Sequence, residues 1–291
     1  MRVSDADVRR YVDDGFLVVD GVVQPAELDE LKEDAVRFAR GEYPLVNPVA
    51  LPDGASDEEA MASVLTVHFP HWVSEVMRRY VTHPGVSAAL SRITAAHLPH
   101  WDGSVKCMQS MLFVKPPSLP GQAWHQDERF IPTRDRSLVG AWMALDDATV
   151  ENGCLRVLPG SHRNGYLWPT RAHERPGEFD TADEAFGFDE SGEIAVEVKA
   201  GALVFFNGYL LHRSFRNGSD VHRRALVNHY CNAWSLLPWK PTATNLKGAE
   251  IAVLDNRNIV PVGDDPYASK GYSTPPTAVF LRPHEPDQRW A

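Results

Sequence analysis

Three side chains in this sequence have the types and spacing that could hold one metal ion. His125 and Asp127 stand two positions apart within the segment 124–127, and side chains two apart on an extended strand face the same side. A third ligand must come from elsewhere, and His212 is the strongest candidate because it follows the apolar run 201–206 by a few residues. Two imidazoles and one carboxylate form the facial triad of non-haem iron(II), which leaves one face of the octahedron open. The pattern therefore predicts an iron site.

The remaining candidate metal ligands are weaker. Three cysteines, which are odd in number and widely spaced, predict neither a disulfide framework nor a zinc site; they are Cys107, Cys154 and Cys231. Seven histidines have no partner at ligand spacing, and we expect them to be surface or hydrogen-bonded core residues: His68, His71, His83, His97, His100, His173 and His284.

Short apolar runs that could position the metal ligands begin at about residue 105. They are rich in Val, Phe, Met and Leu and are separated by Pro, Gly and Asp clusters, which favours strands over helices; the runs are 105–114, 138–145, 154–158, 194–198, 202–206 and 223–231. Many strands without alternating helices predict an antiparallel sandwich or jelly roll. The pair Asn152-Gly153 between two runs favours a tight turn with positive φ.

The first part of the chain, residues 1–104, has mostly helical patterns. Capping signals and apolar spacing predict four helices and one short strand, with a loop over 42–64; the helices cover about 4–15, 25–40, 73–80 and 86–97, and the strand covers 16–19. We therefore expect one domain over 1–291, mainly β with flanking α-helices.

Two further segments do not follow the strand pattern. Residues 163–192 are rich in Gly, Pro and acidic residues, so they form either a solvated loop or a lid over a site. Residues 233–291 contain several prolines, and we expect an irregular segment that wraps on the core built by 105–232.

Composition excludes several classes of function. The 291 residues are 43% hydrophobic and 23% charged, as in an ordinary globular protein. Lys and Arg number 29 against 39 Asp and Glu, and a net charge of −10 is unfavourable for binding a nucleic-acid backbone. No apolar run approaches the length of a membrane span, and the polar start lacks the apolar region of a signal peptide. We therefore expect a cytoplasmic protein whose partner is a small-molecule substrate, without nucleic acid or membrane.

Several ordered motifs resemble the phytanoyl-CoA dioxygenase family of iron(II)- and 2-oxoglutarate-dependent oxygenases. The similarity spans nearly the whole chain, and it is carried by the segments 14–19, 111–117, 125–127, 141–142, 151–155, 158–162, 212–226 and 265–271. One departure is Ala202, where many relatives carry Asp, but this position is not a ligand position.

The resemblance implies a double-stranded β-helix, the cupin-like jelly roll, with iron(II) held by His125, Asp127 and His212. It implies that 2-oxoglutarate and O2 are cosubstrates, and that ascorbate could serve as an activator in vitro. The far carboxylate of 2-oxoglutarate would bind Arg223 and Ser214, because an arginine fork matches a carboxylate.

Other residues of the cosubstrate pocket follow from the same resemblance. Met111 and Trp142 would line it, although both could equally be ordinary core residues. Arg224 is adjacent to Arg223, but strand alternation points neighbouring side chains to opposite faces, so only one of them can reach the pocket. The spacing from His212 that the resemblance implies selects Arg223.

The activity that the resemblance implies is oxidation, by default hydroxylation, of an unactivated C–H bond while 2-oxoglutarate becomes succinate and CO2. A role in secondary metabolism is one possibility. Desaturation, cyclisation or epimerisation would use the same chemistry, and the two rival classes are a cupin-like metal enzyme without 2-oxoglutarate and a non-catalytic binding module. Proximity to the motif selects six candidates for the substrate pocket: His68, Phe69, Trp72, Glu128, Arg129 and Phe130.

Overall fold

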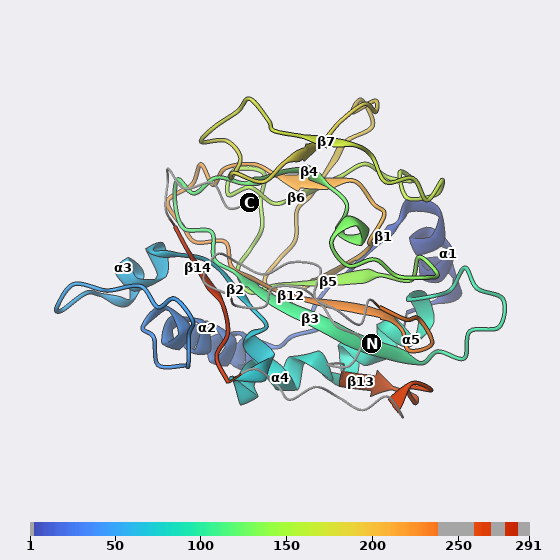
Figure 1. The fold of residues 1–291 in the computed structure, drawn as a ribbon, viewed down its shortest axis with the longest axis horizontal. Helices are drawn as coiled ribbons and strands as arrows, with labels where there is room; N and C mark the ends of the chain where they lie inside the picture. Colours follow the sequence, from blue (N-terminus) through green and yellow to red (C-terminus); the bar gives the residue numbers. More distant parts are fainter. Residues whose placement is uncertain (1–2, 238–258, 269–276, 285–291) are drawn as a thin grey trace.

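Two antiparallel sheets face each other in the computed structural model, which describes residues 3–237, 259–268 and 277–284 (Figure 1). The larger sheet has the order β1-β10-β5-β12-β3-β2-β14, with β13 paired to β3, and the smaller sheet has the order β4-β11-β6-β9. The larger sheet consists of β1 (Phe16–Val19), β2 (Val64–His68), β3 (Val105–Phe113), β5 (Val139–Ala144), β10 (Leu203–Asn207), β12 (Ala225–Asn232), β13 (Ile259–Val262) and β14 (Leu281–Pro283). The smaller sheet consists of β4 (Gln122–His125), β6 (Leu155–Val157), β9 (Ile194–Val196) and β11 (His212–Ser214). The prediction of a mainly β, jelly-roll core is confirmed.

The larger sheet is buried on both faces. On β5, Trp142 and Ala144 point into the apolar layer between the sheets, whereas Ala141 and Met143 pack with the helices behind the sheet. Figure 1 shows α2, α4 and α5 on this outer side. A strand covered on both faces needs apolar residues at every position, which explains the continuous apolar runs in the sequence.

The helices begin and end close to the predicted places. They are α1 (Asp5–Asp14), α2 (Pro25–Ala39), α3 (Asp57–Ala62), α4 (Glu75–Val81) and α5 (Pro84–Ile93), with single 3-10 turns η1 (Pro70–Trp72) and η2 (Asp127–Arg129). The prediction of a loop over 42–64 was wrong at its end, where α3 begins with a capping box between Ser56 and Glu59. Six residues are too few to show a helical period, so only the cap could have indicated this helix.

Two strands lie in the segment 233–291, which was expected to be irregular. β13 pairs with β3, and β14 pairs with β2 at the end of the sheet order, and both contain a proline. Prolines are tolerated in edge strands although they read as strand breakers in a sequence. The predicted wrap over 238–258, 269–276 and 285–291, and the last residues of the 265–271 motif, lie outside the described residues.

The insertion 163–192 is anchored to the smaller sheet. It contains the paired strands β7 (Thr170–Arg171) and β8 (Glu184–Ala185). The Gly121 amide donates to the Glu178 carbonyl at 2.8 Å, and the Asp180 amide donates to the Gly121 carbonyl at 2.7 Å. The insertion therefore extends across the start of β4. These hydrogen bonds distinguish it from a purely solvated loop, which would not contact the sheet.

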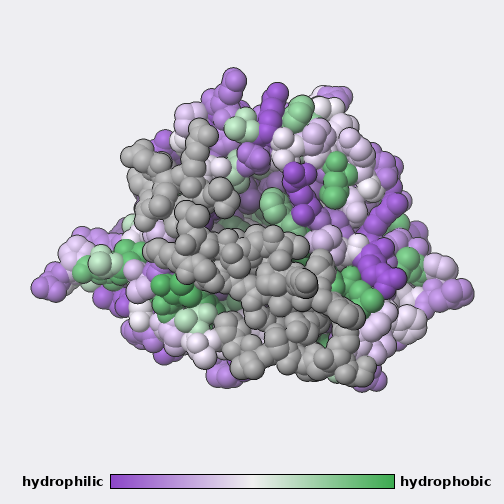
Figure 2. Space-filling model, in the orientation of Figure 1, coloured by the Kyte–Doolittle hydropathy of each residue, from purple (hydrophilic) through white to green (hydrophobic). Residues whose placement is uncertain are grey.

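The described part of the face drawn in Figure 2 shows no large apolar patch. On the coloured part of the face in Figure 2, hydrophilic residues predominate and hydrophobic residues form small separate patches. Within the described ranges, no helix has both the length and the apolar character needed to cross a bilayer.

Gly121 marks the closest approach between β4 and β11. A Cβ atom at this position would lie 1.7 Å from the Ser214 carbonyl oxygen, and the register between the strands shifts between His212 and Ser214. The two strands can adopt this spacing only because residue 121 has no side chain.

We expect Gly121→Ala to lower the free energy of unfolding by about 1–3 kcal/mol, the usual cost of forcing extra volume into a packed site. Urea denaturation would measure the loss. Gly192→Ala is the matched control, because its Cβ would meet only a flexible Leu158 methyl group at 3.4 Å. Equal stability of the two variants would show that β4 and β11 are not held at this distance.

Candidate metal centre

His125 and His212 are direct partners across the smaller sheet. Their Cα atoms pair in the antiparallel register of β4 and β11. Each imidazole is oriented by its own chain: His125 Nδ1 bonds to the Ala123 carbonyl at 2.8 Å and His212 Nδ1 bonds to the Leu210 carbonyl at 3.0 Å. A carbonyl accepts only from an N–H, so both rings carry their proton on Nδ1 and present a bare Nε2.

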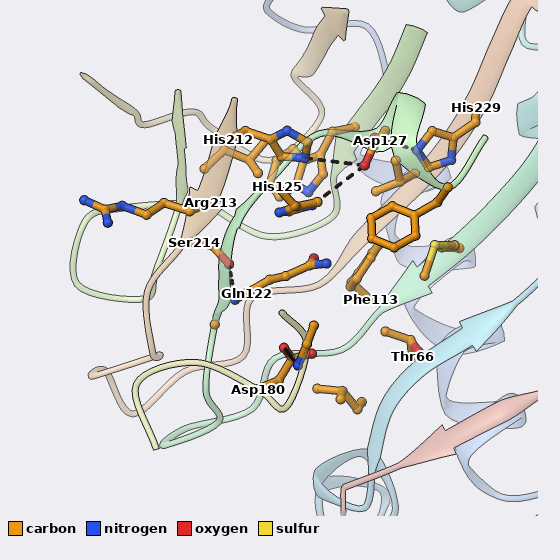
Figure 3. A pocket seen from close by; sticks show the side chains of 18 of the residues that line it. Thr66, Phe113, Gln122, His125, Asp127, Asp180, His212, Arg213, Ser214 and His229 are labelled. Atoms are coloured by element: carbon orange, nitrogen blue, oxygen red, sulfur yellow. Dashed lines mark hydrogen bonds and ion pairs between the residues drawn. The ribbon is translucent and has the colours of Figure 1, made fainter. Parts of the chain in front are cut away.

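Asp127 completes the cluster from just beyond the strand. β4 ends at His125, and Asp127 begins η2, so the assumption that a strand carries both residues was wrong. Gln126 between them is still extended, with φ −132° and ψ 123°, and the alternation therefore holds for one more residue. Asp127 Oδ1 lies 3.7 Å from the Nε2 atoms of His125 and His212, and the three ligand atoms lie within 4.8 Å of one another (Figure 3).

A third histidine, His229 on β12, supports the carboxylate from the opposite sheet. Its Nε2 lies 2.9 Å from Asp127 Oδ2, and Figure 3 shows it on the far side of Asp127 from the other two imidazoles. We did not predict this residue. The sequence could have indicated it, because His229 is an even number of residues from Arg223 and Val227, and alternation puts such side chains on one face of a strand. All three line the cavity described below.

Electrostatics keep His125 and Asp127 in the states that bind metal. Burial, with a smaller effect of the neighbouring His212, lowers the pKa of His125 to about 4. Burial opposes ionisation of Asp127, but His212, His229 and His125 outweigh it and hold the pKa of this carboxyl below its usual value. At neutral pH the cluster therefore offers a neutral imidazole and a carboxylate without first losing protons.

The triad opens into a cavity of about 530 Å³ between the two sheets. Met111, Val227 and Trp142 form one row across β3, β12 and β5 and line this cavity on the side of the larger sheet. Phe206 closes it behind the metal site, with its ring 4.6 Å from the ring of His212. The walls near the ligands are thus largely apolar.

The two adjacent arginines point in opposite directions, as alternation predicts. Arg223 lines the cavity, is 4% exposed, and its guanidinium carbon lies 5.5 Å from the centre of the Trp142 ring. Arg224 makes a paired interaction with Asp146, Nε to Oδ2 at 2.7 Å and Nη2 to Oδ1 at 2.8 Å. β12 begins only at Ala225, so both arginines lie in the extended segment before the strand.

Arg223 has an unsatisfied donor. Among the described residues its Nε has no hydrogen-bond partner, and no acidic side chain forms an ion pair with it. Burial lowers its pKa to about 10. An unpaired buried cation is costly, so this group is arranged to receive an anion from the cavity.

The six candidates for the substrate pocket divide into two sets. His68, Arg129 and Phe130 line the cavity, together with the insertion residue Asp180. Phe69, Trp72 and Glu128 do not: Phe69 and Trp72 pack with the helical core, and the Glu128 carboxylate turns away to bind Thr133 Oγ1 at 2.6 Å. Position next to the motif did not distinguish the two sets, because the 3-10 turns η1 and η2 determine which of these side chains face the cavity.

Comparison with known proteins identifies the family of this chain. A sequence model described as phytanoyl-CoA dioxygenase matches residues 11–225. "Phytanoyl-CoA dioxygenase 1" of Oryza sativa subsp. japonica is 39% identical over 137 residues, which are 45% of this chain and 48% of that protein. The chain thus matches about half the length of this relative. "Phytanoyl-CoA dioxygenase domain-containing protein 1" of Danio rerio is 27% identical over 282 residues, covering 82% of this chain and 93% of the relative.

Among solved structures, the epimerase SnoN in complex with Fe3+, alpha ketoglutarate and nogalamycin RO has a similar fold. It is 20% identical, has a TM-score of 0.64, and the match covers 89% of this chain and 98% of that one. This similarity supports the arrangement of the two sheets. Because the family's sequence model covers well over half of the chain, the protein belongs to the phytanoyl-CoA dioxygenase family.

Proposed function

We propose that this protein is an iron(II)- and 2-oxoglutarate-dependent dioxygenase that oxidises, by default hydroxylates, a C–H bond of a small molecule, while 2-oxoglutarate becomes succinate and CO2. One observation carries the proposal. The three ligand atoms of the His-Asp-His cluster and the unsatisfied cation of Arg223 face the same cavity. A metal ion at one end and a cation at the other suit a ligand with two anionic ends.

The donor set fits iron(II). Two imidazole nitrogens and one carboxylate oxygen are the ligands of the facial triad, and both imidazoles are fixed in the tautomer that binds a metal. Bound iron(II) with 2-oxoglutarate and O2 would supply the oxidation of an unactivated C–H bond. The chain holds the ligands in place, and its apolar walls at Met111, Trp142 and Phe206 exclude water from the reacting atoms.

The other end of the cavity fits the far carboxylate of 2-oxoglutarate. Arg223 and the Ser214 hydroxyl both line this end, and a guanidinium binds a carboxylate through two parallel charge-assisted hydrogen bonds. A buried arginine here also separates the proposal from a cupin-like enzyme that does not use 2-oxoglutarate, because such an enzyme has no need for an unpaired cation.

The rest of the cavity is the proposed place for the prime substrate. It extends past His68, Arg129 and Phe130 towards Asp180 of the insertion, which forms an ion pair with Arg282 of β14 at 3.1 Å. This wall carries both polar and apolar side chains, which suits a small organic molecule that carries polar substituents.

The protein supplied with iron(II), 2-oxoglutarate and ascorbate in air should slowly form succinate even without a prime substrate. Asp127→Ala should abolish this, since the remaining imidazoles provide only two ligands. Succinate is measured by chromatography. A wild-type protein that binds iron but shows no 2-oxoglutarate binding in an anaerobic titration would contradict the proposal.

The two adjacent arginines give a test with an internal control. Arg223→Ala should weaken 2-oxoglutarate binding by about 3–5 kcal/mol, as for a broken buried ion pair, which is at least about a hundredfold in dissociation constant. Arg224→Ala should change it less than about threefold, since a partly exposed ion pair is worth about 1 kcal/mol or less, and Asp146 keeps Lys32 at 3.3 Å. Anaerobic titration of both variants with 2-oxoglutarate measures the two affinities. A larger loss of affinity in Arg224→Ala than in Arg223→Ala would show that Arg224 binds the cosubstrate.

Removing the supporting histidine should weaken the metal site without removing a ligand. His229→Ala leaves Asp127 Oδ2 without its partner, and loss of such a supporting hydrogen bond costs about 10–100-fold in metal affinity. Competition with a chelator would measure the affinity for manganese(II). His97→Ala is the control, because His97 is exposed and bonds only to the Asp135 carbonyl. Unchanged affinity in His229→Ala would mean that Asp127 needs no support.

A further inference from the structure

A second buried cation, Lys115, lies beside Arg223. The Arg223 amide donates to the Lys115 carbonyl at 2.9 Å, which places the two residues side by side. Lys115 is 4% exposed and lines the same cavity, two positions beyond Phe113 on the cavity face. Neither the metal centre nor the resemblance to the family assigns it a role.

Lys115 Nζ is surrounded by three oxygen acceptors. It donates to the Gly153 carbonyl at 3.3 Å, to Ser214 Oγ at 3.1 Å and to the Phe215 carbonyl. Only the charged ammonium has three N–H donors, so this environment matches the protonated form. Three sequence motifs, 111–117, 151–155 and 212–226, therefore converge on one nitrogen atom.

Gly153 makes room for this contact. Its φ is +75°, and a Cβ atom there would lie 2.3 Å from the Phe215 carbonyl oxygen and 2.8 Å from Lys115 Nζ. The glycine of the Asn152-Gly153 turn is thus needed for the turn itself and also for the access of the lysine to the carbonyls.

The contacts of Ser214 determine where its proton points. Its Oγ accepts from Lys115 Nζ at 3.1 Å and from the Gln122 amide at 3.4 Å (Figure 3 shows the second contact). A hydroxyl has two lone pairs and one proton. With both lone pairs engaged, the proton is left to donate into the cavity, and the hydroxyl can face only an acceptor.

We propose that Lys115 is a positioning residue for the cosubstrate. Lys115 fixes the Ser214 hydroxyl as a donor, and it adds positive charge beside Arg223 for the far carboxylate of 2-oxoglutarate. This inference rests on the proposed function. Burial, and then the charge of Arg223, hold the pKa of Lys115 well below its usual value. A carboxylate placed between the two cations would relieve this repulsion.

The test compares two ligands that differ only in the far carboxylate group and its linker. 2-Oxoglutarate and pyruvate share the 2-oxo acid group, but pyruvate lacks the far carboxylate. Calorimetric titration of the nickel(II)-loaded protein with each ligand gives binding without turnover. Lys115→Met should weaken the binding of 2-oxoglutarate by at least about tenfold, as for a lost charge-assisted contact. The same substitution should change the affinity for pyruvate by less than about twofold.

Three further variants separate positioning from a general structural role. Lys115→Gln, which keeps a donor for the carbonyl groups, serves if Lys115→Met does not fold, and it should show a smaller loss in the same direction. Lys199→Met removes an exposed lysine that pairs with Asp147, and it should leave the affinity for both ligands unchanged. In a Ser214→Ala background, Lys115→Met should have a smaller effect than in the wild type, because the hydroxyl that it orients is already absent.

Two results would overturn the inference. Equal weakening of pyruvate and 2-oxoglutarate would show that Lys115 supports the fold of the site in general, and unchanged 2-oxoglutarate affinity in the folded variants would show that it has no role. A wild-type protein that binds pyruvate and 2-oxoglutarate equally, or binds neither, would instead contradict the proposed function, and the role of Lys115 would fail with it.

Discussion

The carboxylate of Asp127 connects the two sheets of this protein at the candidate metal centre. One oxygen faces the imidazoles of His125 and His212 on the smaller sheet, and the other accepts from His229 on β12 of the larger sheet. A buried carboxylate is costly unless it is paired on all sides. Asp127 is therefore a polar link between the two sheets, which otherwise pack through the apolar layer around Trp142, Leu155 and Val227.

The opposite end of the cavity has the complementary property. Arg223 and Lys115 bring two buried cations together, and no described acidic side chain is in contact with either of them. A protein tolerates such an arrangement where a ligand brings the missing negative charge. The distribution of charge thus gives the cavity a direction, from a metal site to an anion site, before any substrate is considered. In the proposed function, the prime substrate would occupy the wall that includes His68, Arg129, Phe130 and Asp180.

Much of this could be predicted from the sequence because it follows from local spacing. The shared face of His125 and Asp127 and the opposite directions of Arg223 and Arg224 follow from alternation along an extended segment. The β-strand runs were indicated by short apolar stretches, and His212 by its place after the run 201–206 and by the resemblance to the family. His229 and Lys115 also obey this alternation. They were missed because their partners, Asp127 and Ser214, are 102 and 99 residues away.

Other features could not be predicted because they depend on tertiary packing. Nothing near Phe69, Trp72 or Glu128 in the sequence shows that they turn away from the cavity, since that depends on how η1 and η2 pack. The short helix α3 and the proline-containing edge strands β13 and β14 are stabilised by capping or by a neighbouring strand, and have too few residues to show a period.

A crystal structure of the protein with manganese(II) and 2-oxoglutarate, grown without oxygen, would test the central claim most directly. We expect manganese on the Nε2 atoms of His125 and His212 and on Asp127, with the 2-oxo acid end of the ligand on the metal and its far carboxylate against Arg223 and Ser214. A ligand bound with its far carboxylate away from Arg223, or a metal held by other side chains, would contradict it.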